Sequence, residues 1–350
     1  MSLIRKLKYH PFFIRLLNWE YWSFNVLYAP LYPYWFWLCF KARAFFYINA
    51  TNPGIPNGGF LMESKKEIYD ILPFGSYPTT LFFVAGTKSE TVINRLQKEN
   101  LYFPLIGKPD IGMRGMSVKK LENEEDVKAY VQHADFDFLI QSYIPFEEEV
   151  GIFYYRIPGE EKGKITGIVG KEFLSVIGDG VSTIDQLLQL DPRYILQLPV
   201  LRKTMREELN IVLNKGEQRV LVPYGNHARG AKFIDLSHLA DEKLNAIIDA
   251  LAKQIKGFYY GRMDIRYESI DLLRAGKSFM IVELNGSGSE PTHIYDPKHS
   301  VFYAWREIAR HWKIMCKISI LNHAKGVPYM TRTEGLAMLK ANAALIKKIS

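Results

Sequence analysis

The chain has 350 residues, of which 48% are hydrophobic, enough to bury a sizeable core and to divide into two or three compact units. Its 45 basic and 37 acidic residues give a formal charge of +8, which favours anionic partners such as nucleotides, nucleic acid or a membrane surface. The two cysteines, Cys39 and Cys316, lack CxxC spacing, so neither a disulfide framework nor a zinc site is expected and the simplest location is the cytoplasm.

The first 50 residues are basic at the start and then crowded with aromatic side chains. The most apolar run, residues 24–40, contains Pro30 and Pro33, which is poor material for a spanning helix of about 20 residues. No small-residue cleavage pattern is present, so a secretory signal is not expected. Two interpretations stay open: residues 10–50 rest on the inner face of a membrane, or they form a core or a homodimer contact. The basic residues that would accompany a membrane contact are Lys6, Lys8, Lys41 and Arg43.

Regular patterns begin at Leu101 and mix strands with helices. Alternation and apolar runs predict strands at residues 101–108, 137–144, 151–157, 164–177, 259–266 and 278–284. Helical periodicity and capping residues predict helices at 124–133, from Ser182 or Thr183 onward, at 241–256, at 301–321 and at 334–349. This order predicts an α+β protein of several lobes.

Polar residues share one face of each of two neighbouring predicted strands. In GRMDIR, alternation places Arg262, Asp264 and Arg266 together, and in VELN it places Glu283 beside Asn285. If the two strands pair, the carboxylates and the amide form an oxygen cluster that suits a hard divalent cation with substrate phosphates. The alternative is an Asp264–Arg262 salt bridge with Asn285 as a turn residue.

Two lysines lie in apolar strands further upstream. Lys108 ends FPLIGKP, and the loop after it carries Gly112, Gly115 and Ser117, a combination of a point charge and accessible backbone N–H groups that suits phosphate. Lys171 lies inside a second apolar strand, where its charge is costly unless an anion meets it. The alternative for Lys171 is an edge-strand lysine that opposes aggregation.

Between these lysines, an apolar strand ends in exposed backbone and a carboxylate follows. The exposed backbone could bind the edge of an adenine ring, and the carboxylate could bind the two hydroxyls of a ribose. The residues concerned are Gln141, Ser142, Tyr143, Ile144 and Glu149.

Taken in order, these elements resemble the ATP-grasp superfamily over roughly Leu101 to Pro291. GRMDIR and VELNGSGSEP are most similar to D-alanine–D-alanine ligases, and VIGDGVSTIDQL and NHARGAKFID are similar to cyanophycin synthetases. The resemblance implies an α+β ATP-grasp fold in which two lobes clasp ATP after an aromatic-rich N-terminal region. The implied boundaries are residues 1–98, a central lobe at 99–180, and a C-terminal lobe with the metal site at 181–350.

The resemblance also implies an enzyme, an ADP-forming carboxylate–amine ligase that uses ATP with Mg²⁺, or with Mn²⁺, and acts through an acyl phosphate. It implies that Lys108 and Lys171 contact phosphates, that Gln141 to Ile144 frame adenine and that Glu149 binds ribose. It further implies that Asp264, Glu283 and Asn285 hold the metal and that Arg262 steadies negative charge at the attacked carbonyl. Gln141 departs from the Glu of many relatives, and the N-terminal third does not match the usual substrate lobe.

Three segments are candidates for binding the acid and amine substrates, which we expect to be amino acids or peptides. Glu63 and Ser64 follow Gly58-Gly59, with an ordinary turn as the alternative. The loop Asn226-His227-Ala228-Arg229 suits a carboxylate, with a plain surface loop as the alternative. His293 lies near the metal residues in sequence, and an ordered loop histidine is its alternative.

Two other functions remain open from the sequence. The fold could end its reaction at phosphorylation, as a small-molecule kinase. The chain could instead be a membrane-surface protein with a vestigial nucleotide site. No RNP, zinc-finger or helix-turn-helix signature supports nucleic-acid binding.

Overall fold

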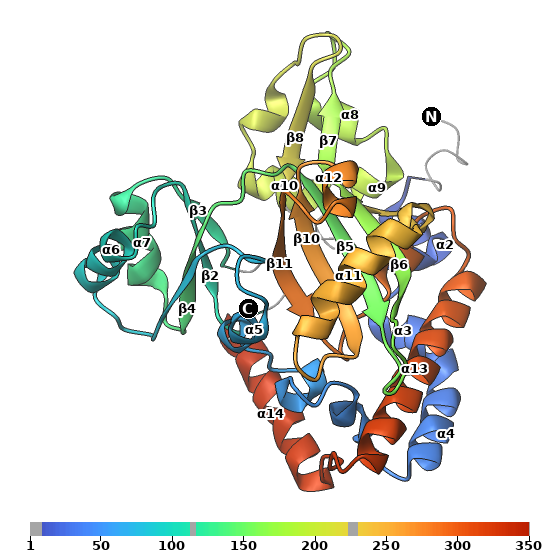
Figure 1. Cartoon of the computed structure of the whole chain (residues 1–350). Coiled ribbons are helices and arrows are strands. Elements are labelled where there is room, and N and C mark those ends of the chain that lie inside the picture. The colour runs from blue at the N-terminus through green and yellow to red at the C-terminus, as the bar shows by residue number, and fades with distance from the viewer. Residues whose placement is uncertain (1–8, 113–116, 223–229, 350) are drawn as a thin grey trace. The chain divides into compact units, whose positions relative to one another are not determined.

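The computed structural model describes residues 9–112, 117–222 and 230–349 (Figure 1). The chain divides into two compact units. The first unit comprises Met1–Pro33, Val169–Asp235 and Thr292–Glu307, and the second comprises Tyr34–Ile168, Leu236–Pro291 and Ile308–Ser350. Both units contain helices and strands, often in runs of one kind, which confirms the predicted α+β class.

The strands of the described residues are short, and most coincide with predicted apolar segments. They are β1 (Thr80–Phe83), β2 (Leu105–Pro109), β3 (Lys119–Leu121), β4 (Phe138–Ser142), β5 (Glu148–Tyr155), β6 (Lys164–Glu172), β7 (Leu174–Ile177), β8 (Gln218–Val222), β9 (Lys232–Asp235), β10 (Tyr260–Tyr267) and β11 (Phe279–Asn285). The predicted run at 164–177 is two strands, because the chain leaves the sheet at Phe173.

The α-helices of the described residues include all the predicted ones. They are α2 (Pro11–Leu17), α3 (Phe24–Tyr28), α4 (Tyr32–Ala42), α5 (Lys65–Ile71), α6 (Ser89–Lys98), α7 (Glu124–His133), α8 (Ile184–Leu188), α9 (Pro192–Ile195), α10 (Leu198–Thr204), α11 (Glu242–Gln254), α12 (Ile270–Arg274), α13 (Val301–Ala324) and α14 (Arg332–Ile349). Thr183 caps α8 in a reciprocal capping box with Gln186, and Asp241 caps α11, so local capping chemistry sets both starts.

The second unit contains two sheets. The smaller has the order β1-β4-β2-β3 with antiparallel pairs, and α6 and α7 pack on it through Val92, Leu96 and Val127 (Figure 1). In the larger sheet β10 lies between β11 and β5, both antiparallel to it. Helix α11 buries Leu244 and Ile248 in the core of that sheet, because its apolar residues recur every three to four positions.

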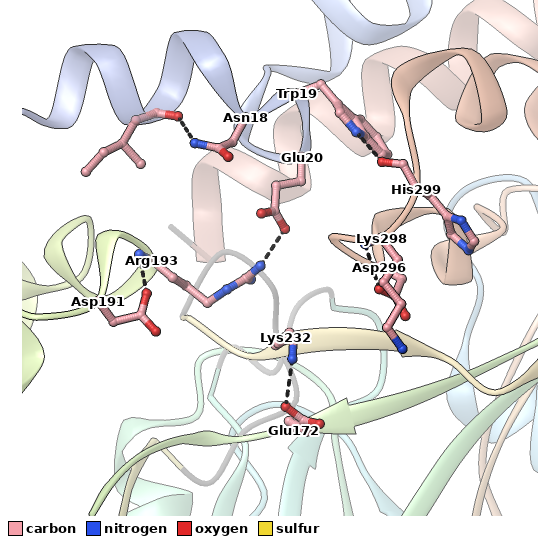
Figure 2. A network of polar contacts seen from close by, with 11 residues as sticks. Asn18, Trp19, Glu20, Glu172, Asp191, Arg193, Lys232, Asp296, Lys298 and His299 are labelled. Atoms are coloured by element: carbon pink, nitrogen blue, oxygen red, sulfur yellow. Dashed lines mark hydrogen bonds and ion pairs between the residues drawn. The ribbon is translucent and has the colours of Figure 1, made fainter. Parts of the chain in front are cut away.

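The first unit contains the end of β6 from Val169 onward, the strands β7, β8 and β9, and the start of the chain. Its part of β6 pairs with β9, and β7 pairs with β8 over a core that includes Leu174 and Leu188. Figure 2 shows how the N-terminal segment joins this unit: Glu20 accepts from Arg193 at 2.6 Å, and Trp19 Nε1 donates to the His299 carbonyl at 2.9 Å. The Glu20 and Arg193 side chains are both about nine-tenths buried.

The N-terminal aromatic segment is therefore partly core. Ile14, Leu27 and Tyr28 are buried, whereas Leu17 and Phe24 are exposed. Among the described helices, none combines the length and hydropathy needed to cross a membrane.

Candidate functional site

Four polar side chains meet on one face of the β10–β11 pair in the second unit. The antiparallel register places Arg262 opposite Asn285 and Asp264 opposite Glu283. Directly opposed residues of an antiparallel pair point to the same face, and residues two apart on one strand do as well. The predicted pairing of the two strands is confirmed, with α12 as the connection between them.

Arg262 and Asp264 form a bidentate ion pair. Arg262 Nε lies 2.6 Å from Asp264 Oδ1, and Nη2 lies 3.1 Å from Oδ2. Burial alone would lower the pKa of Arg262, but Asp264, with Glu283 and Glu290 nearby, raises it. The salt bridge that the sequence offered as an alternative is therefore present, and it lies within the predicted cluster.

The donor set of this cluster fits a hard divalent cation. Two carboxylates and an amide oxygen are ligands that Mg²⁺ and Mn²⁺ accept together with phosphate oxygens. Asn285 Nδ2, a hydrogen-bond donor, and Ser287 Oγ are buried and have no hydrogen-bond partner within the described structure, so they remain available to an anionic ligand such as a phosphate oxygen. No group of three or more His, Cys, Asp and Glu in a metal-holding arrangement occurs among the described residues, and the proposed set has only two such side chains.

The segment from Gly58 to Glu63 packs against the end of β11. Ser287 N donates to the Gly58 carbonyl at 3.1 Å, and Gly288 N donates to the Gly59 carbonyl at 2.7 Å. A Cβ on Gly59 would lie 2.7 Å from Gly286 Cα, so only glycine permits this approach. The predicted pair Gly58-Gly59 thus reaches the predicted metal strand.

Glu63 belongs to the same corner of the site. Its Oε1 accepts from Gly286 N at 2.9 Å. The pKa of Glu63 is raised to about 7, chiefly by burial and with a contribution from the nearby Glu283, while the hydrogen bond from the Gly286 N–H opposes the rise. Met62, immediately before it, holds φ 64°, a costly conformation for a side chain of its kind. The backbone is therefore strained at Met62, directly before the residue whose side chain enters the site.

Lys108 is buried at the end of β2, and two side chains accept hydrogen bonds from its ammonium group. Its Nζ donates to Tyr69 Oη at 2.7 Å and to Gln141 Oε1 at 3.0 Å. Burial lowers the pKa of Lys108 to about 8, against the opposing influence of Glu283 and Asp110. A buried ammonium near the carboxylate cluster is a local positive charge that an anion would complement.

The predicted adenine and ribose residues lie at the end of β4 and the start of β5. Gln141 Nε2 donates to Thr80 Oγ1 at 2.6 Å, so this side chain is engaged by Thr80 and Lys108, and an adenine contact would use backbone. Ser142 is half-buried, Tyr143 is exposed and Ile144 is buried. Glu149 lies 3.5 Å from Arg266 Nε, which holds its carboxylate.

The glycine loop and Ser64 have local structural roles. The Gly112 carbonyl accepts from Lys65 Nζ at 3.2 Å, and the Ser117 carbonyl accepts from Tyr130 Oη at 3.1 Å. Ser64 caps α5 and donates to Asp110 Oδ1 at 3.0 Å. Gly115 lies outside the described residues.

Two predicted residues belong to the first unit. Lys171 is half-buried opposite Phe233 of β9. Because β6 has neighbours on both sides in its sheet, the edge-strand interpretation of Lys171 is wrong. His293 is buried 3.8 Å from Glu307, in contact with the Tyr303 ring. The predicted loop residues Asn226, His227 and Arg229 lie outside the described residues.

Tyr69 is the site residue that sequence reasoning missed. It accepts from Lys108 and donates to the Val282 carbonyl at 2.5 Å, so it links β2 to β11, the strand that carries Glu283 and Asn285. It lies on the short helix α5, in a segment that carries no motif. Only the spatial contact identifies it.

No family model matches the sequence, and no curated protein matches it. Solved structures do match. A D-alanine–D-alanine ligase from Bacillus anthracis is 15% identical over 75% of this chain and 69% of that chain, with a TM-score of 0.41. The same ligase complexed with ATP is 13% identical over 75% of this chain and 66% of that chain, with a TM-score of 0.40. A bifunctional glutathione synthetase from Pasteurella multocida is 14% identical over 70% of this chain and 35% of that chain, with a TM-score of 0.40.

The solved structures named here are ligases, and the chain is similar to each at 15% identity or less. At these identities and scores the likeness does not specify a reaction or a substrate.

Proposed function

We propose that the chain is an ATP-dependent, ADP-forming carboxylate–amine ligase, similar to D-alanine–D-alanine ligases in joining amino acids or peptides. The observation that supports this most is the cluster of Arg262, Asp264, Glu283 and Asn285 on one face of β10 and β11. In this proposal Asp264, Glu283 and Asn285 hold Mg²⁺ or Mn²⁺, which would offset phosphate charge when bound.

The reaction has two steps. The γ-phosphoryl group of ATP moves to a substrate carboxylate, which gives an acyl phosphate and ADP. A substrate amine then attacks the acyl carbon, forms the amide bond and expels phosphate, with loss of the amine proton. A free carboxylate is a poor electrophile, so phosphorylation supplies the leaving group.

The chain's own residues would position the reactants and offset charge. Lys108, held by Tyr69 and Gln141, would face phosphate oxygens in one orientation because both partners restrain its ammonium. Lys171 would supply a second cation. The strand end from Gln141 to Ile144 would meet adenine, and Glu149 would meet the ribose hydroxyls.

Arg262 suits the stabilisation of the tetrahedral oxyanion. The ion pair with Asp264 uses Nε and Nη2, which leaves other guanidinium N–H groups for a ligand. Because Asp264 fixes the plane of the guanidinium, those donors are oriented before the charge develops.

Glu63 is the residue of the second unit best placed to meet a substrate. Its carboxylate lies against Gly286, directly after the metal strand, and the unpartnered Ser287 Oγ lies in the same turn. A substrate ammonium would complement Glu63, and a substrate carboxylate would accept from Ser287.

The test is ADP and phosphate release from Mg²⁺-ATP with pools of amino acids, dipeptides and hydroxy acids, followed by mass spectrometry. A product lighter by one water than the sum of an acid and an amine would support the ligase. A phosphorylated product would instead identify a kinase. ATP binding without any release would favour a vestigial nucleotide site.

Two variants test the metal assignment in the same assay. Glu283→Gln should abolish turnover with little change in melting temperature, because it keeps the size of the side chain and removes only the charge that Glu283 presents to Lys108 and Arg262. Asp264→Asn should abolish turnover and also lower stability, since it leaves Arg262 buried without its partner. Full activity in both variants would contradict the assignment.

A further inference from the structure

A groove of about 800 Å³ lies away from the proposed site, at the end of α4 and the start of α14 in the second unit. Residues 39–41 and 43–46 line one side, and residues 330–332 line the other. Gly335 of α14 packs directly on the Phe46 ring, so the two segments are held together beneath the groove. The groove is thus part of a packed structure.

Aromatic side chains beside this groove are exposed. Phe40 is 83% exposed, and Phe36, Trp37 and Phe45 are each about half exposed. Phe36 and Phe45 contact each other, with ring centroids 6.4 Å apart. A soluble monomer rarely leaves four large aromatic residues exposed together, so this cluster indicates a binding surface.

The same surface is positively charged. Lys41, Arg43 and Arg332 line the groove, and none of its lining residues is acidic. Lys41 Nζ lies 5.4 Å from the centroid of the Trp37 ring. Neither Arg43 nor Arg332 forms an ion pair in the part of the chain that the structure describes. We call Phe36, Trp37, Phe40, Phe45 and these three cations the aromatic–basic face.

Arg43 occupies a position that ordinarily favours glycine. It follows α4 with φ 56°, its N–H donates to the Phe40 carbonyl, and the Ala44 N–H donates to the Cys39 carbonyl. This is a Schellman ending, in which the left-handed residue is usually glycine because a side chain there is strained. Arg43 therefore places a guanidinium at the edge of the groove at a cost in backbone strain.

We propose that the aromatic–basic face binds the surface of a membrane that contains anionic phospholipids. Half-exposed aromatic rings suit the boundary between headgroups and acyl chains, and the three cations suit the phosphate layer. A symmetric contact with a second copy would bring the same cations toward one another, which disfavours a dimer here. This inference goes beyond the ligase reaction and does not depend on it.

The test is flotation of the full chain with vesicles of phosphatidylcholine, alone or mixed with phosphatidylglycerol. We expect binding only to the mixed vesicles, weakened by salt. Arg43→Gly should reduce the partition coefficient about fivefold, because each basic residue near such a surface contributes about that factor. The same variant should keep or raise the melting temperature, since glycine relieves the strain at this position. Phe40→Ser should reduce binding about tenfold.

Two matched controls lie away from the groove. Lys128→Gln removes an exposed charge from α7, and Phe74→Ser removes a fully exposed aromatic ring. Both should bind vesicles like the wild type. The proposal would be overturned if the chain bound neither kind of vesicle. It would also be overturned if Lys128→Gln lost as much vesicle binding as Arg43→Gly. A lipid-free dimer that Phe40→Ser dissociates would also overturn it, in favour of contact with a second copy.

Discussion

Replacement of Lys108 by methionine tests whether the buried ammonium of Lys108 lowers the free energy of unfolding. Methionine has a similar length and no charge, so the packing at the end of β2 should largely persist. The pKa of Lys108 falls from its ordinary value of 10.5 to about 8 because of burial. This difference corresponds to a cost of about 3 kcal/mol for carrying the charged form in the folded state at neutral pH.

Loss of the hydrogen bonds to Tyr69 and Gln141 offsets part of the gain, by about 1–2 kcal/mol. We therefore expect Lys108→Met to be more stable than the wild type by about 1–2 kcal/mol at pH 7, and to bind ATP much more weakly. The measurements are denaturant unfolding and calorimetric titration with ATP. Lys128→Met on the exposed side of α7 is the control, and it should leave both quantities unchanged.

The pH dependence gives a second readout. Between pH about 8 and 10.5 the unfolded chain holds a proton at Lys108 that the folded chain has lost. The free energy of unfolding of the wild type should therefore rise with pH across this range relative to that of Lys108→Met. A variant that is less stable than the wild type, with a stability difference independent of pH, would refute the reasoning. A stabilised variant that binds ATP normally would remove Lys108 from the phosphate site.

Three further substitutions probe the contacts around the site and within the first unit. Tyr69→Phe should raise the KM for ATP more than it lowers kcat, because it removes a hydrogen bond that orients the ammonium of Lys108. Unchanged kinetics would contradict the role of Tyr69 in positioning Lys108. Gly59→Ala should reduce turnover strongly, since its Cβ would meet Gly286 at 2.7 Å, and a fully active variant would show that the turn can shift. Glu20→Gln should lower the free energy of unfolding by about 3–5 kcal/mol, because it leaves Arg193 charged and buried. Adding Arg193→Met should restore most of that loss in urea unfolding, and no recovery would argue against the ion pair as the cause.

Local chemistry made most of the elements predictable. The helix at 124–133 and the start of α8 follow from periodicity and from capping side chains that act over three or four residues. The end of one strand was not predictable in the same way: the apolar run at 164–177 has no turn signal, and only pairing with different partners separates β6 from β7.

The candidate site shows the same division. Alternation within two strands was enough to place Asp264 beside Arg262 and Glu283 beside Asn285, because side chains two residues apart share a face. The register that joins the pairs involves strands about twenty residues apart, and it depends on the packing of a whole sheet. For Glu63 and Tyr69 the separation from β11 exceeds 200 residues.

The sequence by itself determined the α+β class, most of the element order and the polar residues that share a face of two neighbouring strands, because these depend on short-range periodicity. Tertiary structure alone decided that Lys108 is solvated by Tyr69 and that Glu63 lies against Gly286. It also decided which aromatic residues of the N-terminal region are buried and which form the aromatic–basic face. Burial and long-range contact arise from the packing of distant segments, which no local pattern encodes.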